Sequence, residues 1–336
     1  MFPAGTIRSI VALSSQKART MADRAATPTD LPRMPMQLPS PLKGTLVGTI
    51  AVIVWATGGP VITFAPGIPP FQLIAMTFVV FFLALLPVWL VRGENIAAKF
   101  AMPARVWIVG TLGPWGYTVF FFHSYQLIPP VHASLILMSW PIVLLLANAA
   151  FKGRRIRWWH GAGAAAGFLG AAVLVVGRGD GIAGFSDGSI WGYLMAAAGA
   201  LTFCAYSFAR SSWPQVPTDA GALFCLAGAG LALIIHFPLE TTVMPDATGW
   251  AVVACFGLLS VTVSLYTWDY GMKYGQVRAL VSLTYLTPLM TAFILIAIGA
   301  DQLSTAVATA CFLIVGGAFL GSKDMFTRAG RAEADG

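Results

Sequence analysis

The sequence predicts an all-α integral membrane protein with ten transmembrane helices, arranged as two inverted five-helix repeats. Three observations support this prediction: an apolar composition, ten apolar segments of suitable length, and an internal duplication. Hydrophobic residues make up 57% of the 336 residues, and charged residues make up only 10%. A soluble domain carries about 25% charged residues, so this chain has too few of them to cover a water-facing surface.

The duplication is centred on residues 131–150, an apolar run that contains Pro141 and no Asp, Glu, Lys or Arg. A shift of 147 residues places Pro141 on Pro288, without a gap on either side. Each match is weak alone, but together with the matching hydropathy they indicate two copies of one unit. The other pairs that coincide, the last two under a shift of 148, are Gly110/Gly257, Leu112/Leu259, Ala150/Ala297, Gly170/Gly317, Ala171/Ala318, Gly44/Gly192 and Trp55/Phe203.

Ten apolar segments follow a polar N-terminal stretch. Each is close to the ~20 residues with which a helix crosses ~30 Å of hydrocarbon. Residues 44–177 are expected to form the first five-helix repeat and residues 189–322 the second. Residues 1–43 and 323–336 are polar and are expected to be tails, the first of them disordered. The segments are about 44–65, 69–91, 106–127, 131–150, 158–177, 189–210, 217–238, 249–272, 276–299 and 302–322.

The charged residues set the expected orientation. With the N-terminus inside, the inner tails and connections hold 19 of the 20 Lys and Arg residues, and the outer connections hold only Arg178. Cytoplasmic connections carry such an excess, so both tails are predicted to be cytoplasmic. The same distribution accounts for the net charge of +7 without a nucleic-acid partner.

Five helices are an odd number, so the second copy must enter the membrane in the opposite orientation. The basic connection KGRR (152–155) is expected inside, and its counterpart GADQ (299–302) is expected outside. Inverted repeats are typical of transporters that bind substrate near the membrane midplane, between the halves and on interrupted helices. The duplication therefore indicates a transporter.

Recognisable catalytic and metal-binding patterns are missing from the sequence. It contains no HExxH, GxSxG or Walker motif, and its four cysteines lie in apolar runs without CxxC spacing. We expect no catalytic residue, metal or cofactor, and therefore no enzyme. Asp269 is the only acidic residue well inside an apolar segment. Proton-coupled transporters usually bury acidic or His relays, so facilitated or exchange transport is favoured over proton coupling.

Pro141 and Pro288 are predicted hinges. Each removes a backbone N–H in mid-membrane, which is tolerated where neighbouring helices or water satisfy the freed carbonyl. Broken backbone beside hydroxyl groups and aromatic rings can hold a zwitterion with an apolar side chain. The alternative is a kink needed only for packing. The predicted substrate-binding residues beside the prolines are Met138, Ser139, Trp140, Thr284 and Tyr285.

Further aromatic and histidine side chains fall at membrane depth. Rings that line a cavity would accept flat or bulky apolar ligands. An intramembrane His is costly without a partner or water, so His123 either bonds a neighbouring helix or lines the cavity. His132 and His236, at segment ends, are expected to be interfacial. The predicted substrate-binding residues of this group are His123, Trp55, Tyr117, Tyr206 and Trp268.

Asp269 lies near the inner end of the eighth segment, four residues before Lys273. Side chains at positions i and i+4 face each other on a helix, so one interpretation is a local ion pair. The alternative is an inner gate, in which Asp269 pairs across the halves with Arg210 or Arg278 while the inside is closed.

Small residues recur at a spacing of four, as in Gly163 with Gly167 and Gly317 with Gly321. Such spacing lets helix backbones approach closely. Packing within one chain is the first interpretation, and a dimer interface is the alternative. The expected partners are a small-molecule substrate and the lipid bilayer, for a protein that we expect to be a monomer.

Two inverted copies with openings such as GTLVGTIAVIVWAT and GYLMAAAGALTFCAYSFAR resemble the EamA-type repeats of the drug/metabolite transporter superfamily. The resemblance covers residues 42–322 and is greatest to members that export aromatic and other neutral amino acids. It implies a ten-helix monomer with a central cavity in a bacterial inner membrane. Small multidrug members carry a Glu in their first helix, and the sugar-phosphate branch has basic residues deep in its ninth helix. This chain has neither, which disfavours drug/proton antiport and anionic substrates.

These observations predict an inner-membrane exporter of aromatic and other neutral amino acids and related metabolites. It is expected to work by alternating access, as a facilitative or exchange transporter. The alternative is efflux of cations or drugs with proton antiport by the same fold, which would make Asp269 essential.

Overall fold

The computed structural model describes residues 40–62, 67–128, 130–152, 157–178, 189–297, 299, 304–321 and 323. Every regular element within these ranges is a helix, which confirms the expected all-α class. Apart from residues 40–43 and 323, the two polar tails expected at 1–43 and 323–336 lie outside the described residues.

The helices cover the apolar segments expected from the sequence, and a π-helix, η1, continues one of them. In chain order the elements are α2 (Pro41–Ile62), α3 (Pro70–Val91), α4 (Ile96–Lys99), α5 (Ala104–Leu127), α6 (Pro130–Leu137), α7 (Trp140–Lys152), α8 (Trp158–Arg178), α9 (Ile190–Ser212), α10 (Ala220–Leu239), α11 (Ala247–Phe256), η1 (Gly257–Val263), α12 (Ser264–Tyr274), α13 (Val277–Leu283), α14 (Leu286–Ala297) and α15 (Thr305–Gly321).

Local sequence explains where several helices begin. Pro70 opens α3, and proline suits a first turn because the N–H that it lacks would have no helical partner there. Asp246 caps α11 by accepting a hydrogen bond from the Gly249 N–H at 2.7 Å. Asn95 caps the short helix α4 in the same way. Caps of this kind satisfy N–H groups that a helix leaves unpaired at its start.

Five helical stretches in the described part of the chain have both the length and the hydropathy of a membrane span. Three more apolar stretches are shorter, and α5 and α8 cover the remaining expected segments. The five long stretches are Pro70–Val91, Ile190–Ser212, Ala220–Leu239, Ala247–Tyr274 and Val277–Ile294, and the shorter ones are Pro41–Thr57, His132–Asn148 and Thr305–Leu320.

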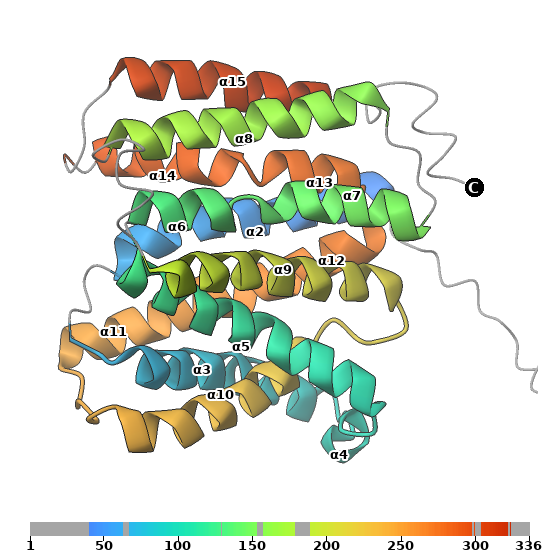
Figure 1. Ribbon diagram of the computed structural model, residues 1–336. Helices are drawn as coiled ribbons and strands as arrows, with labels where there is room; N and C mark the ends of the chain where they lie inside the picture. The colour runs from blue at the N-terminus through green and yellow to red at the C-terminus, as the bar shows by residue number, and fades with distance from the viewer. Residues whose placement is uncertain are drawn as a thin grey trace, which may run out of the picture. The chain divides into compact units, whose positions relative to one another are not determined.

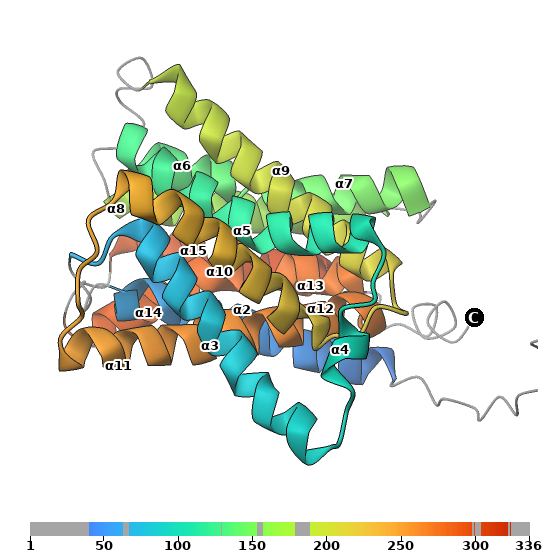
Figure 2. The same ribbon diagram turned by 90° about the horizontal axis from the view of Figure 1, so that it is seen from below.

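The long helices lie side by side, whereas the half-helices α6 and α7, and likewise α13 and α14, follow each other in the same direction (Figure 1). The turn between α12 and α13 lies at the same end of the molecule as α4. The connection from α10 to α11 lies at the opposite end (Figure 1). The helices form four main neighbouring pairs: α2 with α12, α3 with α10, α5 with α9, and α8 with α15. The view turned by 90° also shows α3 beside α10 (Figure 2).

Both proline-containing segments of the duplication are interrupted helices. α6 ends at Leu137 and α7 begins at Trp140, so that Pro141 lies in the first turn of the second half-helix. In the other copy α13 ends at Leu283 and α14 begins at Leu286, again with the proline in the first turn. Because a first-turn proline removes no helical hydrogen bond, the helix breaks before the proline instead of kinking at it.

The π-helix η1 was not anticipated. In it the Thr262 hydroxyl donates to the Gly257 carbonyl five residues earlier, at 2.8 Å. The matching stretch of the first copy, residues 110–116, contains Pro114 and three glycines. Both copies therefore depart from regular α-helical sequence or geometry at the same place, next to the central residues described below.

Candidate functional site

Six aromatic rings gather where α2, α5, α7, α9 and α12 meet. Phe203 is the hub, with ring centroids 4.9 Å from Trp140, 5.0 Å from Tyr117, 5.8 Å from Trp55, 6.0 Å from Tyr206 and 6.4 Å from Trp268. Trp268 in turn contacts Trp55 at 5.2 Å and Trp140 at 5.5 Å. We call these six residues the aromatic cluster.

Four rings of the aromatic cluster are buried, and two are partly exposed. Trp268, Tyr206, Trp140 and Phe203 are each at most 5% exposed, whereas Trp55 and Tyr117 are partly exposed. The indole N–H of Trp268 donates to the Ser207 hydroxyl at 3.0 Å, which satisfies its polar atom inside the protein. Trp55 and Tyr117 are therefore the cluster members that a ligand could contact directly.

Five of the six cluster residues were predicted to bind substrate, and the structure brings all five together. Phe203, the residue that joins them, was missed as a site residue. The only signal in the sequence was its position under Trp55 in the duplication. The two residues are in contact, so equivalent positions of the two copies meet inside the cluster.

The residues at the two helix breaks divide into two groups. Trp140 begins α7 and belongs to the aromatic cluster, whereas Tyr285 packs on α8, with its ring against Gly167 and 6.5 Å from the ring of Phe168. Met138 is partly buried in the turn between α6 and α7. The aromatic side chains at the two breaks therefore have different neighbours.

The hydroxyl groups at the breaks bond to their own half-helices. Ser139 donates to the Ile136 carbonyl at 2.6 Å, and Thr284 donates to the Val281 carbonyl, also at 2.6 Å. Each hydroxyl thereby bonds to a carbonyl in the last turn before the interruption, and the Ile136 carbonyl also accepts from the Ser139 N–H at 3.0 Å. A substrate would meet them as groups already engaged with backbone.

The histidines differ in their surroundings. His123 on α5 is partly exposed, its Nδ1 lies 2.8 Å from the Val119 carbonyl, and its ring is 5.7 Å from that of Phe71. His132 and His236 lie near helix ends, and both are buried within the protein. His132 Nδ1 lies 3.0 Å from the Tyr193 hydroxyl, and this hydrogen bond offsets the free-energy cost of burying the imidazole.

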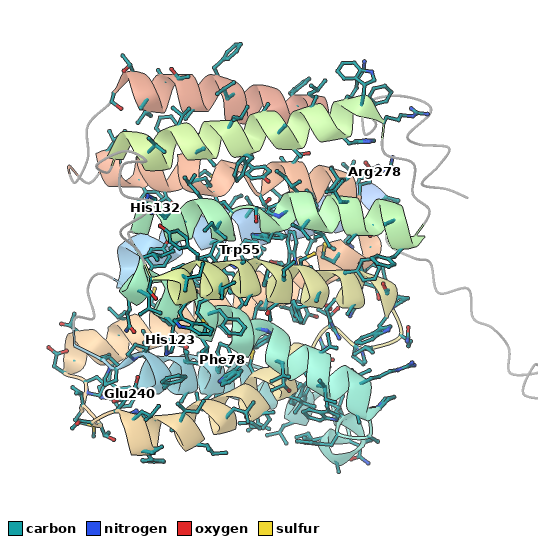
Figure 3. All side chains as sticks on the ribbon, viewed as in Figure 1. Trp55, Phe78, His123, His132, Glu240 and Arg278 are labelled. Carbon is teal, nitrogen blue, oxygen red and sulfur yellow. The ribbon has the colours of Figure 1, made fainter. Side chains whose placement is uncertain are left out.

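Figure 3 shows where Trp55, His132, Glu240 and Arg278 lie along the length of the helices. Trp55 lies between His132 at one end and Arg278 at the other, and Glu240 lies at the same end as His132 (Figure 3). The aromatic cluster, which contains Trp55, is therefore far from both ends of the helices.

Asp269 lies in a buried group of charges beside the aromatic cluster. It accepts a hydrogen bond from Arg210 Nε and forms an ion pair with Lys273 Nζ at 2.6 Å. Arg210 and Asp269 are only 1% and 2% exposed. The ion pair with Lys273 that was one interpretation therefore exists, and so does the contact with Arg210 that belonged to the other.

The expectation that this pair crosses the halves is wrong. Arg210 lies on α9 and Asp269 on α12, and both belong to the second expected repeat, 189–322. The cations also hold the connection between α9 and α10: Arg210 Nη2 donates to the Pro217 carbonyl at 2.9 Å, and Lys273 Nζ donates to the Val216 carbonyl at 2.6 Å. The group fastens α9, α12 and the connection between α9 and α10 to each other.

A charge contact that does join the two expected repeats involves residues that were not predicted. Asp219, directly before α10, pairs with Lys99 of α4 at 2.6 Å and accepts from the Trp89 indole N–H at 2.7 Å. Lys99 also pairs with Glu94 at 2.6 Å. Burial alone would lower the pKa of Lys99, but its hydrogen bonds and charge interactions with Asp219 and Glu94 outweigh burial and raise it above its ordinary value.

Comparison with known proteins identifies the family. Residues 42–176 match the family model described as "EamA-like transporter family". A relative from Ancylobacter novellus, "Aromatic amino acid exporter YddG", is 38% identical over 274 residues, which cover 82% of this chain and 95% of the relative. A protein of known crystal structure is 37% identical and superposes with a TM-score of 0.80, over 84% of this chain and 98% of its own. The chain is a transporter rather than an enzyme, and it belongs to the EamA-like transporter family of the drug/metabolite transporter superfamily.

Proposed function

We propose that this protein exports aromatic and other neutral amino acids, and related metabolites, across the bacterial inner membrane by alternating access. The observation that carries the proposal is the aromatic cluster beside the two interrupted helices. Six rings gather there from five helices, and the partly exposed Trp55 and Tyr117 offer flat apolar surface to an aromatic side chain. Stacked or edge-to-face ring pairs with such a side chain are favourable. The relative from Ancylobacter novellus is named as an aromatic amino acid exporter, which supports the same substrate class.

The proposed architecture is ten membrane spans in two inverted repeats, and the helix neighbours support it. Inversion relates each span of one copy to the span five places later. Under this rule the pair α5–α9 corresponds to α12–α2, and the pairs α3–α10 and α8–α15 each correspond to themselves. These are the four main neighbouring pairs, so the packing has the two-fold pattern that an inverted duplication produces.

Individual contacts repeat in the same way. A Cβ added to Gly44 would lie 2.3 Å from the carbonyl carbon of Tyr274, and one added to Gly192 would lie 2.8 Å from the Cβ of Leu127. Gly44 and Gly192 are matched by the duplication, as are Leu127 and Tyr274 under the shift of 147. Each glycine lets its helix approach the end of its neighbour closely. The same contact therefore occurs once at each end of the molecule, which supports inversion.

We place the end of the molecule that carries Arg278 and α4 in the cytoplasm, together with both chain termini. Arg92, Lys99 and Lys273 lie in or beside the connections at this end, whereas Glu240 follows α10 at the other (Figure 3). An excess of Lys and Arg on the cytoplasmic side is the general rule for membrane proteins.

In the proposed site the aromatic cluster receives the apolar side chain of the substrate. Trp55 and Tyr117 contact it first because they are the partly exposed members. His123 and the breaks at Met138, Ser139, Thr284 and Tyr285 are proposed to meet its polar groups.

Alternating access is proposed to use the breaks before Pro141 and Pro288 as hinges. The two half-helices that precede them differ in burial: Val281 and Ser282 of α13 are buried, whereas their counterparts Ser134 and Leu135 of α6 are partly exposed. Equivalent segments in unequal surroundings are what one of two alternating states would have, because an inverted pair exchanges its surroundings when the other state forms.

The surroundings of Asp269 weigh against the alternative of cation or drug efflux with proton antiport. A carboxylate that binds a proton or a cationic substrate in turn must be able to exchange partners. Asp269 is held by Arg210 and Lys273 together, and both cations are also bonded to the backbone of the α9–α10 connection. This arrangement favours a structural role for Asp269.

The proposal is tested by uptake of labelled phenylalanine into proteoliposomes that contain the purified protein. Trp140→Ala removes a buried ring of the cluster. Trp158→Ala, the control, removes a ring that is 70% exposed. Trp140→Ala is expected to lower uptake at least tenfold, with Trp158→Ala close to the parent. Unchanged uptake in a correctly folded Trp140→Ala sample would reject the central site.

A further inference from the structure

The helices α3 and α10 lie side by side in both views (Figures 1 and 2) and come from different expected repeats. The proposed alternating access, on which this inference rests, requires some helices to stay together while others move.

At one end of this pair Glu240, the residue after α10, holds the beginning of α3. Its carboxylate accepts hydrogen bonds from the backbone N–H groups of Phe71, at 3.0 Å, and Gln72, at 3.2 Å. These N–H groups belong to the first turn of α3, where a helix supplies no partner of its own. His236 Nδ1 lies 2.8 Å from the same carboxylate and fixes it from the side of α10. The Gln72 side chain adds two hydrogen bonds to the backbone of Val243, at 2.6 and 2.9 Å.

At the opposite end Asp219, the residue before α10, holds the last turns of α3. It accepts from the Trp89 indole at 2.7 Å and pairs with Lys99, whose Nζ also lies 4.9 Å from the centroid of the Trp89 ring. Trp89 is 1% exposed, so its N–H depends on Asp219 for a partner.

Between its ends the pair is in close contact. A Cβ at Gly228 of α10 would lie 3.1 Å from the ring of Phe78, and one at Gly221 would lie 3.2 Å from the ring of Phe81. Two aromatic rings of α3 therefore press directly on the backbone of α10, without an intervening side chain.

A gate in alternating access is closed at one end of the molecule and open at the other. A contact that is fastened at both ends in the same state does not have this property. We propose that α3 and α10 form one rigid unit, clasped by Glu240 and Asp219, that stays intact through the transport cycle while the interrupted helix α6–α7 moves against α9. Asp219 and Glu240 are then positioning residues.

The proposal predicts that a cross-link within the clasped pair leaves transport intact. In a background without the four native cysteines, Phe78→Cys with Gly228→Cys places one thiol on each helix, where the ring and the backbone now touch. The matched control is Leu137→Cys with Gly199→Cys, because a Cβ at Gly199 would lie 2.9 Å from the Leu137 side chain, between α6 and α9. Both pairs are treated with a short, reducible bis-methanethiosulfonate reagent, and phenylalanine uptake is measured before and after reduction.

The expected result is uptake within twofold of the untreated value for the cross-linked 78/228 pair. For the 137/199 pair we expect at least a tenfold loss that reduction restores. A reversible loss in the 78/228 pair overturns the rigid unit, and full uptake by the cross-linked 137/199 pair overturns the proposed movement of α6. If the untreated parent takes up no amino acid, the proposed function itself fails.

In that case the rigid unit is tested by a distance measurement that does not depend on transport activity. Spin labels at exposed Leu83 of α3 and Ile234 of α10 report the distance between the two helices by double electron–electron resonance. The distance distribution is expected to be the same with and without saturating phenylalanine, and with and without a pH gradient. A second or shifted population under any of these conditions overturns the proposal.

Discussion

Replacing Phe203 by leucine tests whether the aromatic cluster selects aromatic substrates. Leucine keeps an apolar side chain of similar size but removes the ring that contacts Trp55, Tyr117, Trp140, Tyr206 and Trp268. A favourable ring pair contributes about 0.5–1.5 kcal/mol beyond the area that it buries. If the substrate ring loses one such partner, its affinity falls about 2- to 12-fold, since 1.4 kcal/mol corresponds to a factor of ten.

The measurement is the concentration dependence of phenylalanine and alanine uptake in the same proteoliposomes. We expect the apparent KM for phenylalanine to rise by this factor and the apparent KM for alanine to stay within twofold. Phe312→Leu is the matched control, because Phe312 on α15 is 80% exposed and lies outside the cluster. An equal rise for both substrates would refute ring selectivity and would instead indicate general damage to the fold.

Two further variants test the packing on which the site depends. Gly44→Ala places a Cβ 2.3 Å from a backbone carbon, at least 1.1 Å closer than an ordinary contact of 3.4 Å. Because overpacking of this kind costs about 1–3 kcal/mol, the midpoint temperature of thermal inactivation should fall. The control Gly316→Ala, whose added Cβ has no atom within 4 Å, should leave the midpoint unchanged or raise it. Equal midpoints for the two variants would contradict the close contact at Gly44. Asp269→Asn leaves Arg210 and Lys273 without their buried counter-charge, which lowers the free energy of unfolding by about 3–5 kcal/mol. We therefore expect little folded protein by size-exclusion chromatography. A well-folded variant that has lost only transport would favour the antiport alternative.

The sequence predicted the all-α class and the positions of the two breaks because these follow from local patterns. Length and hydropathy locate apolar helices, and a proline in each copy marks where a helix stops and restarts. The first turn of α7 contains Pro141 and that of α14 contains Pro288, close to where the duplication suggested an interruption.

The sequence did not predict which side chains point toward the centre of the protein. Helices that are apolar on all sides carry no periodicity that tells an inward from an outward residue. Trp140 and Tyr285 both flank breaks, yet one joins the aromatic cluster and the other packs against α8. Phe203 had no feature that separated it from the other phenylalanines in the chain, apart from its alignment with Trp55.

The polar contacts between distant segments could not be predicted for a different reason. Asp219 and its hydrogen-bond partner Trp89 are 130 residues apart in the sequence, and Glu240 and Phe71 are 169 residues apart. Each residue lies in a connection whose sequence reads as ordinary polar loop. Only the packing of α3 on α10 brings them together, and that packing is a property of the whole fold.

The most direct test of the proposed function is uptake of labelled phenylalanine and leucine by proteoliposomes, with and without an imposed pH gradient. We expect uptake down the concentration gradient that is independent of the pH gradient and is competed by other neutral amino acids. Uptake that occurs only with a pH gradient would contradict facilitative or exchange transport. The absence of uptake, beside an active control transporter, would contradict amino-acid export itself.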